Sequence, residues 1–211
     1  MDDEAHAAVH EAVGLLERAV GFTLGCLHLV TPQAFSRDTP CGEWNLEALL
    51  YHLDDSFIAL HEAVDGGHID LSGPAQPVVD ERSDLVALIR RHASQLVGAW
   101  TRTVDIPPVV DAGAPMPAAL VASTGALEIA VHGWDVAQAC GRHRSIPPAL
   151  SRELLATAPL YVTPAERPDL FGAEVALPRL ASPGDRLLAH LGRNPHRALV
   201  NRTASWLCRA A

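Results

Sequence analysis

Residues 118–141 read AALVASTGALEIAVHGWDVAQACG, and this stretch decides the fold. Its side chains are apolar, small or neutral on every side of a helix, except at Glu128, His132 and Asp135. A helix that is apolar all round is normally buried among other helices. Gly141 then follows, and glycine is the residue that most often terminates a helix. The stretch therefore predicts a buried helix that carries three ionisable groups.

Three further segments repeat apolar residues at the three-and-four spacing of one helix face. The spacing predicts helices over residues 5–30, about 45–65 and about 80–104, each bounded by proline, glycine or capping residues. No alternating pattern typical of strands lies between them. Four long helices in succession predict an all-α fold, a four-helix bundle that occupies residues 1–142.

The remaining residues, 143–211, have a different pattern. They contain a short helix after a pair of prolines, a strand-like run near 173–177, and a capped helix that opens at Ser182. No low-complexity linker separates them from the bundle. We therefore expect a small C-terminal α/β appendage over 143–211 that packs on the bundle.

Composition narrows the classes of function. The chain has 211 residues, 48% hydrophobic content and a formal net charge of −9, which argues against nucleic-acid binding through clustered Lys and Arg. The most apolar run, 19–35, is interrupted by polar residues and a proline, so no membrane span is expected. The four cysteines lie far apart and follow no secretory leader, which predicts a cytoplasmic protein. Small molecules are the expected partners, and a homodimer is left open.

The polar stripe of the fourth helix predicts a metal site. At about 100° per residue, Glu128, His132 and Asp135 fall within an arc of about 60°. A buried charge is costly unless it is paired or binds a metal, and the second helix offers His52 beside its apolar stripe. Two ligands one turn apart and a third from across the bundle resemble a catalytic zinc site with one open position. Zinc is the expected ion and nickel the alternative.

Several assignments stay open at this point. The same ionisable groups could form a hydrogen-bonded network without metal. Asp135, to which we assign a catalytic role, could instead orient a ligand, join the coordination or hold a water. Asp55, three residues after His52, has the same ambiguity, and an exposed carboxylate is the preferred interpretation. We expect Cys41 to be structural, because no basic neighbour is visible, and Trp44 to anchor the core.

Three segments of the sequence together resemble a known family. Residues 39–46 read TPCGEWNL, residues 50–53 read LYHL, and residues 128–135 read EIAVHGWD. Together they resemble the metal-binding domain of mycothiol-dependent maleylpyruvate isomerase, within the DinB-like superfamily. The later segment 185–193, DRLLAHLGR, resembles the end of an actinobacterial subgroup of that family.

The resemblance implies an up-down-down-up bundle and a divalent metal held by His52, Glu128 and His132. It also implies an enzyme that activates a low-molecular-weight thiol such as mycothiol, for isomerisation of an electrophilic small molecule or for thiol transfer to it. The isomerase has a larger second domain than the appendage after Gly141, so the resemblance supports the metal site more than the isomerase activity. A non-catalytic module that binds metal or a small molecule, and a purely structural bundle, are the alternatives.

Overall fold

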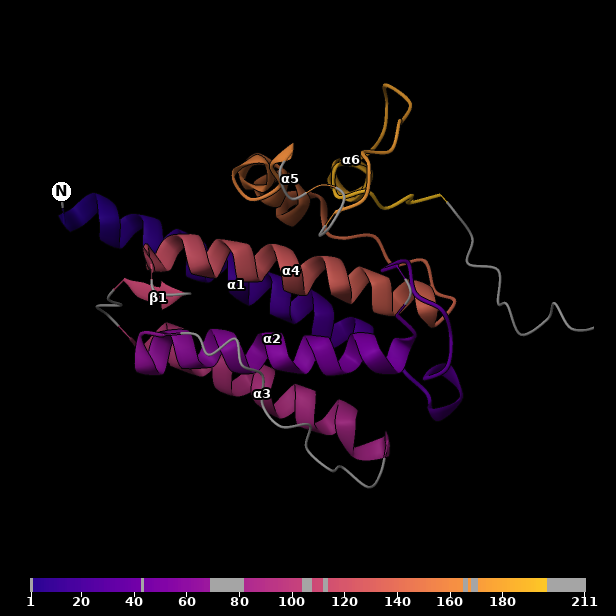
Figure 1. Ribbon diagram of the computed structural model, residues 1–211, viewed down its shortest axis with the longest axis horizontal. Coiled ribbons are helices and arrows are strands. Elements are labelled where there is room, and N and C mark those ends of the chain that lie inside the picture. Colours follow the sequence, from indigo (N-terminus) through magenta and orange to yellow (C-terminus); the bar gives the residue numbers. More distant parts are fainter. Residues whose placement is uncertain are drawn as a thin grey trace, which may run out of the picture.

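Four long helices dominate the structure, a computed structural model that describes residues 2–42, 44–68, 82–103, 108–111, 114–164, 167 and 171–196. They are α1 (Asp2–Leu27), α2 (Leu46–Gly66), α3 (Arg82–Arg102) and α4 (Ala118–Ala139). The predicted all-α bundle is therefore confirmed. Figure 1 shows that α1 and α4 run in one direction and that α2 and α3 run in the other, which makes the bundle up-down-down-up.

Helix α4 is the most deeply buried of the four helices. Sixteen of its 22 residues are buried, as expected for a helix without a polar face. It packs along α1 and also contacts α2, so its polar residues lie between helices rather than at the outer surface. Among the helices that the structure describes, none is long and apolar enough to cross a membrane.

Helices α1 and α4 are in close contact at Gly133. A Cβ atom at this position would lie 2.2 Å from Oγ1 and 3.0 Å from Cα of Thr23. Thr23 is itself buried, and its hydroxyl donates a hydrogen bond of 2.7 Å to the carbonyl oxygen of Ile129. Any larger residue at position 133 would therefore push the two helix backbones apart.

We expect Gly133→Ala to destabilise the protein by about 1–3 kcal/mol, the usual cost of overpacking a core. Gly21→Ala is the matched control, because Gly21 lies on the exposed face of α1 and a Cβ there would meet nothing within 4 Å. Alanine favours the helix, so this control should gain up to about 1 kcal/mol. Urea unfolding measures both changes, and equal stability of the two variants would contradict the close contact.

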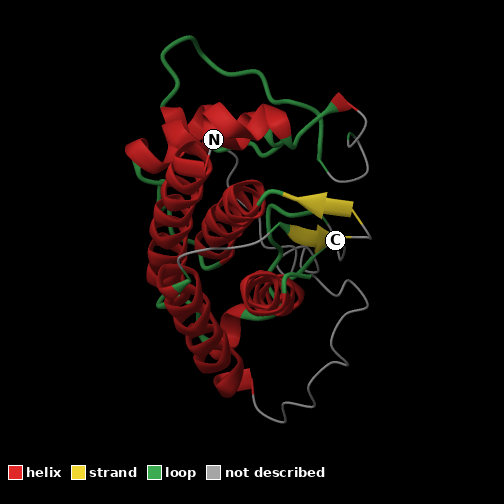
Figure 2. Cartoon of the chain, turned by 90° about the vertical axis from the view of Figure 1, so that its left-hand side faces the viewer, coloured by secondary structure: helices red, strands yellow, loops and turns green. Residues whose placement is uncertain are grey.

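A short β-hairpin lies at the end of the bundle where α3 finishes and α4 begins (Figure 2). Its antiparallel strands are β1 (Val109–Asp111) and β2 (Ala114–Met116). The sequence pattern predicted no strand in this connection. Strands of three residues are too short to produce a recognisable alternation of apolar and polar residues.

The C-terminal part consists of two short helices and extended segments. Helices α5 (Pro148–Thr157) and α6 (Pro183–His190) pack on each other, and α5 also contacts α1 and α4 (Figure 1). Single 3₁₀ turns, η1 (Pro32–Ala34) and η2 (Ala158–Leu160), follow α1 and α5. Helix α6 begins with the predicted cap, because the side chain of Ser182 accepts a hydrogen bond from the backbone of Asp185.

The strand-like run near 173–177 is not a strand, so that detail of the predicted appendage was wrong. The segment has no ladder partner among the described residues. Its Val175 N–H instead donates to the carbonyl oxygen of Ala189, near the end of α6. Apolar alternation suits any extended segment with one partly covered side, and here Val175 and Leu177 are half-buried in a segment that bonds to a helix end rather than to a sheet.

Candidate metal centre

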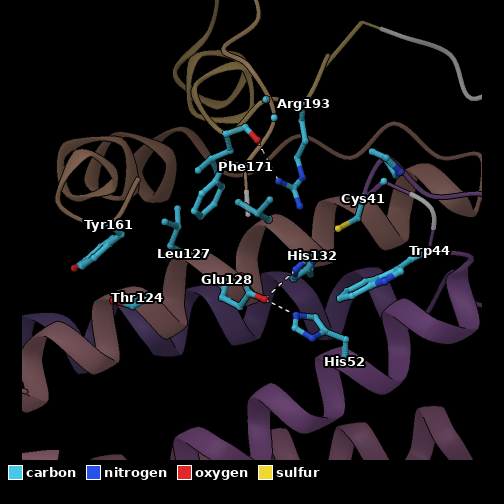
Figure 3. A pocket seen from close by; sticks show the side chains of 16 residues that line it. Cys41, Trp44, His52, Thr124, Leu127, Glu128, His132, Tyr161, Phe171 and Arg193 are labelled. Carbon is cyan, nitrogen blue, oxygen red and sulfur yellow. Dashed lines mark hydrogen bonds and ion pairs between the residues drawn. The ribbon is translucent and has the colours of Figure 1, made fainter. Parts of the chain in front are cut away.

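Three side chains from two helices meet at one point between α2 and α4 (Figure 3). Nε2 of His52 lies 2.6 Å, and Nε2 of His132 lies 2.9 Å, from Oε1 of Glu128. One donor atom of each residue lies within 4.8 Å of the other two. Glu128 and His132 are neighbours because residues four apart share one face of a helix. The structure thus brings together the three residues that the sequence singled out.

The loop before α2 places Trp44 beside the candidate ligands. The side chain of Asn45 caps α2 by accepting a hydrogen bond of 2.9 Å from the backbone of Ala48. The centroid of the Trp44 ring lies 4.7 Å from the centroid of the His52 ring, and Trp44 is 39% exposed. The prediction that Trp44 anchors the core was therefore wrong. Its ring instead covers one side of the candidate ligands.

Asp135 lies behind His132, away from the open side of the site. Nδ1 of His132 donates to Oδ2 of Asp135 at 3.0 Å. The Asp135 carboxylate also accepts from Nε and Nη2 of Arg193, at 3.1 and 2.9 Å. Because Nδ1 carries a hydrogen in this arrangement, Nε2 is the nitrogen that can offer a lone pair to a metal. This is the geometry in which an aspartate orients a histidine ligand.

The electrostatics of the site follow from these contacts. Burial raises the pKa of Glu128, but the charge of His132 and the hydrogen bonds from both histidines outweigh it and hold that pKa below its usual range. Burial lowers the pKa of His132, yet Glu128 and Asp135 together raise it to about 9. For Asp135, burial is outweighed by Arg193 and His132, so its pKa is lowered. Without a metal, these contacts favour ionised carboxylates and a protonated His132 at neutral pH.

The donor set fits a divalent ion. Two imidazole nitrogens and one carboxylate oxygen are typical ligands of zinc, and His52 and Glu128 are 35% and 39% exposed on the side of the cavity. Cys41 forms a second cluster with His132 and Asp135. That cluster fits less well, because Arg193 and the His132 Nδ1–H occupy the Asp135 carboxylate.

The candidate ligands lie at one side of a cavity of about 840 Å³. It is lined by the loop before α2, by α2 and α4, and by C-terminal residues that include Tyr161, Phe171 and Arg193 (Figure 3). Sequence reasoning missed these three, because no helix period places residues of an irregular segment. One feature of the sequence could have indicated Arg193, namely its position in the segment 185–193 that resembles the family. Cys41, expected to be structural, also lines the cavity.

Asp55, and a second pair formed by a histidine and an aspartate, lie apart from the site. Asp55 is exposed, which confirms its interpretation as a surface carboxylate. The preceding Asp54 is buried and accepts a hydrogen bond of 2.7 Å from Nδ1 of His92 on α3. This pair shows how a half-buried histidine and a buried carboxylate satisfy each other outside the cavity.

A four-helix bundle with two histidines and a glutamate open to a cavity defines a class of candidate divalent-metal proteins. The chain belongs to the family described as the mycothiol maleylpyruvate isomerase N-terminal domain, whose model matches residues 16–137. The matched residues include His52, Glu128, His132 and Asp135, whereas Arg193 lies beyond them.

The similar curated proteins come from Mycobacterium tuberculosis. Two uncharacterized proteins, from strains CDC 1551 / Oshkosh and ATCC 25618 / H37Rv, are each 26% identical to this chain over 166 residues. The alignments cover 74% of this chain and 82% of each relative, so the similarity extends beyond a single motif. No solved structure matches the chain.

Proposed function

We propose that this protein is a metal-dependent enzyme that activates a low-molecular-weight thiol, of the mycothiol kind, for reaction with an electrophilic small molecule. The observation that carries the proposal is the convergence of three donor atoms, from His52, Glu128 and His132, beside a cavity large enough for a second reactant. Membership of the family supports the choice of a thiol.

Each residue of the site has a distinct role in this proposal. His52, Glu128 and His132 would hold zinc or, as the alternative, nickel. Such an ion supplies positive charge that lowers the pKa of a thiol beside it. Asp135 does not line the cavity, so we propose that it positions His132 and does not touch the substrate. Burial raises the pKa of the Cys41 thiol to about 11, so Cys41 is protonated in the metal-free protein.

The reaction has two possible outcomes. The thiol gives its proton to the solvent, and its sulfur adds to one carbon of a carbon–carbon double bond that is conjugated to a carbonyl group. The π electrons of that double bond move to the carbonyl oxygen as an enolate. In an isomerisation, the new single bond rotates, the carbon–sulfur bond breaks, the double bond re-forms and the released thiolate recovers a proton from the solvent. In a transfer, the enolate takes a proton from the solvent, and the thiol conjugate is the product. Both outcomes balance without an oxidant or a reductant.

A metal-free bundle is the competing proposal, and one contact favours it. Oε1 of Glu128 lies within hydrogen-bond distance of both histidines, so the three side chains can satisfy one another without an ion. Elemental analysis of protein purified without chelators decides between the two. About one zinc or nickel per chain supports the enzyme, whereas an absence of metal that persists after incubation with either ion supports the hydrogen-bonded network.

A screen for thiol-dependent turnover separates an enzyme from a non-catalytic module. Metal-loaded protein is incubated with mycothiol and a panel of electrophiles, and loss of free thiol or formation of a geometric isomer is measured. Turnover that depends on both metal and thiol supports the proposal. Metal binding without turnover supports a sensor or scavenger. A cytoplasmic location and a homodimer stay predictions.

We expect metal affinity to increase with pH. In the metal-free protein the pKa of His132 is raised to about 9, so at neutral pH an incoming ion must displace a proton from this residue. Displacement of one proton corresponds to an affinity gain of about tenfold per pH unit, which should level off above about pH 9. Competition with a chromophoric chelator at several pH values measures the slope. Affinity that does not change between about pH 6.5 and 8.5 would mean that metal binding displaces no proton from His132.

A further inference from the structure

Apolar side chains line most of the cavity beyond the candidate ligands. Leu127 and Val131 come from α4, and Phe171 and Leu191 come from the C-terminal part. Figure 3 shows Leu127 and Phe171 beside Glu128, on the opposite side from Trp44. A reactant held next to the metal site would therefore contact mainly carbon atoms. Such a surface favours an apolar ligand, because burial of apolar area is the main source of affinity there.

The positive charge of Arg193, which lines the cavity, is already paired with a carboxylate. Arg193 is the one arginine among the described residues that line it, and the chain contains no lysine. Nε and Nη2 of Arg193 donate to the buried Asp135 carboxylate, at 3.1 and 2.9 Å. The remaining Nη1 lies 3.5 Å from the carbonyl oxygen of Leu191. A carboxylate of a ligand would therefore find no unpaired arginine or lysine among these residues.

Charge balance at the metal site favours the binding of a single anion. Histidine ligands are neutral, so Glu128 alone would offset a divalent ion and a single positive charge would remain. One thiolate neutralises that charge. A further anionic group in the cavity would find no unpaired arginine or lysine among the described lining residues, and burial of an unpaired carboxylate is strongly unfavourable.

We propose that the reactant which occupies this cavity has an uncharged, largely apolar body, as in an aromatic or unsaturated electrophile. A dicarboxylic acid such as maleylpyruvate, which appears in the name of the family, does not suit it. The inference rests on the proposed thiol activation and adds the class of the second reactant. The residues that select this class are Phe171, Leu127 and the Arg193/Asp135 pair.

The test measures binding to the cobalt-loaded protein with two matched thiols. Benzyl mercaptan and 4-(mercaptomethyl)benzoate differ by one carboxylate, and that group is too far from the sulfur to chelate the ion. Binding of a thiolate to Co²⁺ produces a charge-transfer band in the near ultraviolet, whereas the visible bands of Co²⁺ show that the ion stays bound. The readout therefore requires no turnover.

We expect benzyl mercaptan to bind at least about tenfold more tightly than its carboxylate analogue, a modest estimate for a buried charge without a partner. Phe171→Arg should reverse this preference, because it places a free cation in the cavity. Phe171→Leu is the matched control, which removes the ring but adds no charge and should keep the preference. Phe171 is half-buried, so these substitutions leave the core of the bundle intact.

The outcomes separate this inference from the proposed function. Equal affinity of the two thiols, or tighter binding of the carboxylate, overturns the inference and leaves the thiol activation in place. Absence of a charge-transfer band with either thiol, while the visible bands persist, overturns the thiol activation on which the inference rests. A Phe171→Arg variant that keeps the parent preference also overturns it, because charge would then not control selection.

Discussion

His132→Ala should abolish tight binding of zinc, whereas His92→Ala should leave it unchanged. His132 supplies one of three candidate donor atoms, and its loss leaves only His52 and Glu128. His92 is the matched control because it is also an imidazole that contacts a buried aspartate, yet it does not line the cavity. Competition with a chromophoric chelator measures both affinities. Parent affinity in the His132→Ala variant would show that the three-ligand assignment is wrong.

Asp135→Asn distinguishes a positioning residue from a ligand. Loss of a residue that hydrogen-bonds to a metal ligand typically weakens metal binding by about 10- to 100-fold. This variant should therefore still bind zinc at micromolar protein concentrations if the parent site is tight. The same chelator competition applies, with urea unfolding to establish that the variant is folded. If Asp135→Asn loses zinc as completely as His132→Ala, then Asp135 coordinates the ion and the open position is absent.

Arg193→Ala should destabilise the protein by about 3–5 kcal/mol, the usual cost of removing one partner from a buried ion pair. The Arg193 side chain is 12% exposed and Asp135 is fully buried, so the aspartate would keep its charge without the cation that offsets its burial. The change would also remove one of the contacts between the C-terminal part and α4. Urea unfolding monitored by circular dichroism measures the loss.

A surface ion pair supplies the control for this prediction. Arg18 on α1 pairs with Glu153 on α5, and their side chains are 47% and 43% exposed. Exposed pairs contribute about 0–1 kcal/mol, so Arg18→Ala should have little effect on stability. The double variant Asp135→Leu/Arg193→Met should recover most of the loss, because apolar residues of similar size often replace a buried pair without cost. If Arg193→Ala and Arg18→Ala cost the same, the buried pair contributes nothing beyond a surface contact.

The fold was predictable because its main signals are local. The apolar composition of 118–139 requires burial, and the spacing of the other apolar residues gave helices close to α1, α2 and α3. The convergence of three candidate ligands was predictable for the same reason. Helix geometry places Glu128 and His132 on one face, and His52 lies beside the apolar stripe of the second helix. These positions depend on the helix period and on burial, and both can be read from one sequence.

The rest of the site could not be predicted, because it depends on how irregular segments pack. Trp44 precedes a helix, where an aromatic residue usually packs into the core, but here its ring lies tilted against the ring of His52. Phe171 and Arg193 lie far along the chain from Glu128, and no period relates them to α4. Their places follow from the packing of α5 and α6 on the bundle, which only a three-dimensional structure shows.

The ion pair between Asp135 and Arg193 joins α4 to a segment that is synthesised much later. During synthesis Arg193 is added 58 residues after Asp135, when every candidate metal ligand has already been made. Until then the buried carboxylate has only His132 as a cationic partner, so the ribosome-bound bundle lacks one of its strongest internal contacts. A nascent chain that ends near residue 142 therefore has the ligands but not the full stability of their support. The support of His132 by the Arg193/Asp135 pair therefore forms only after the C-terminal part has been made.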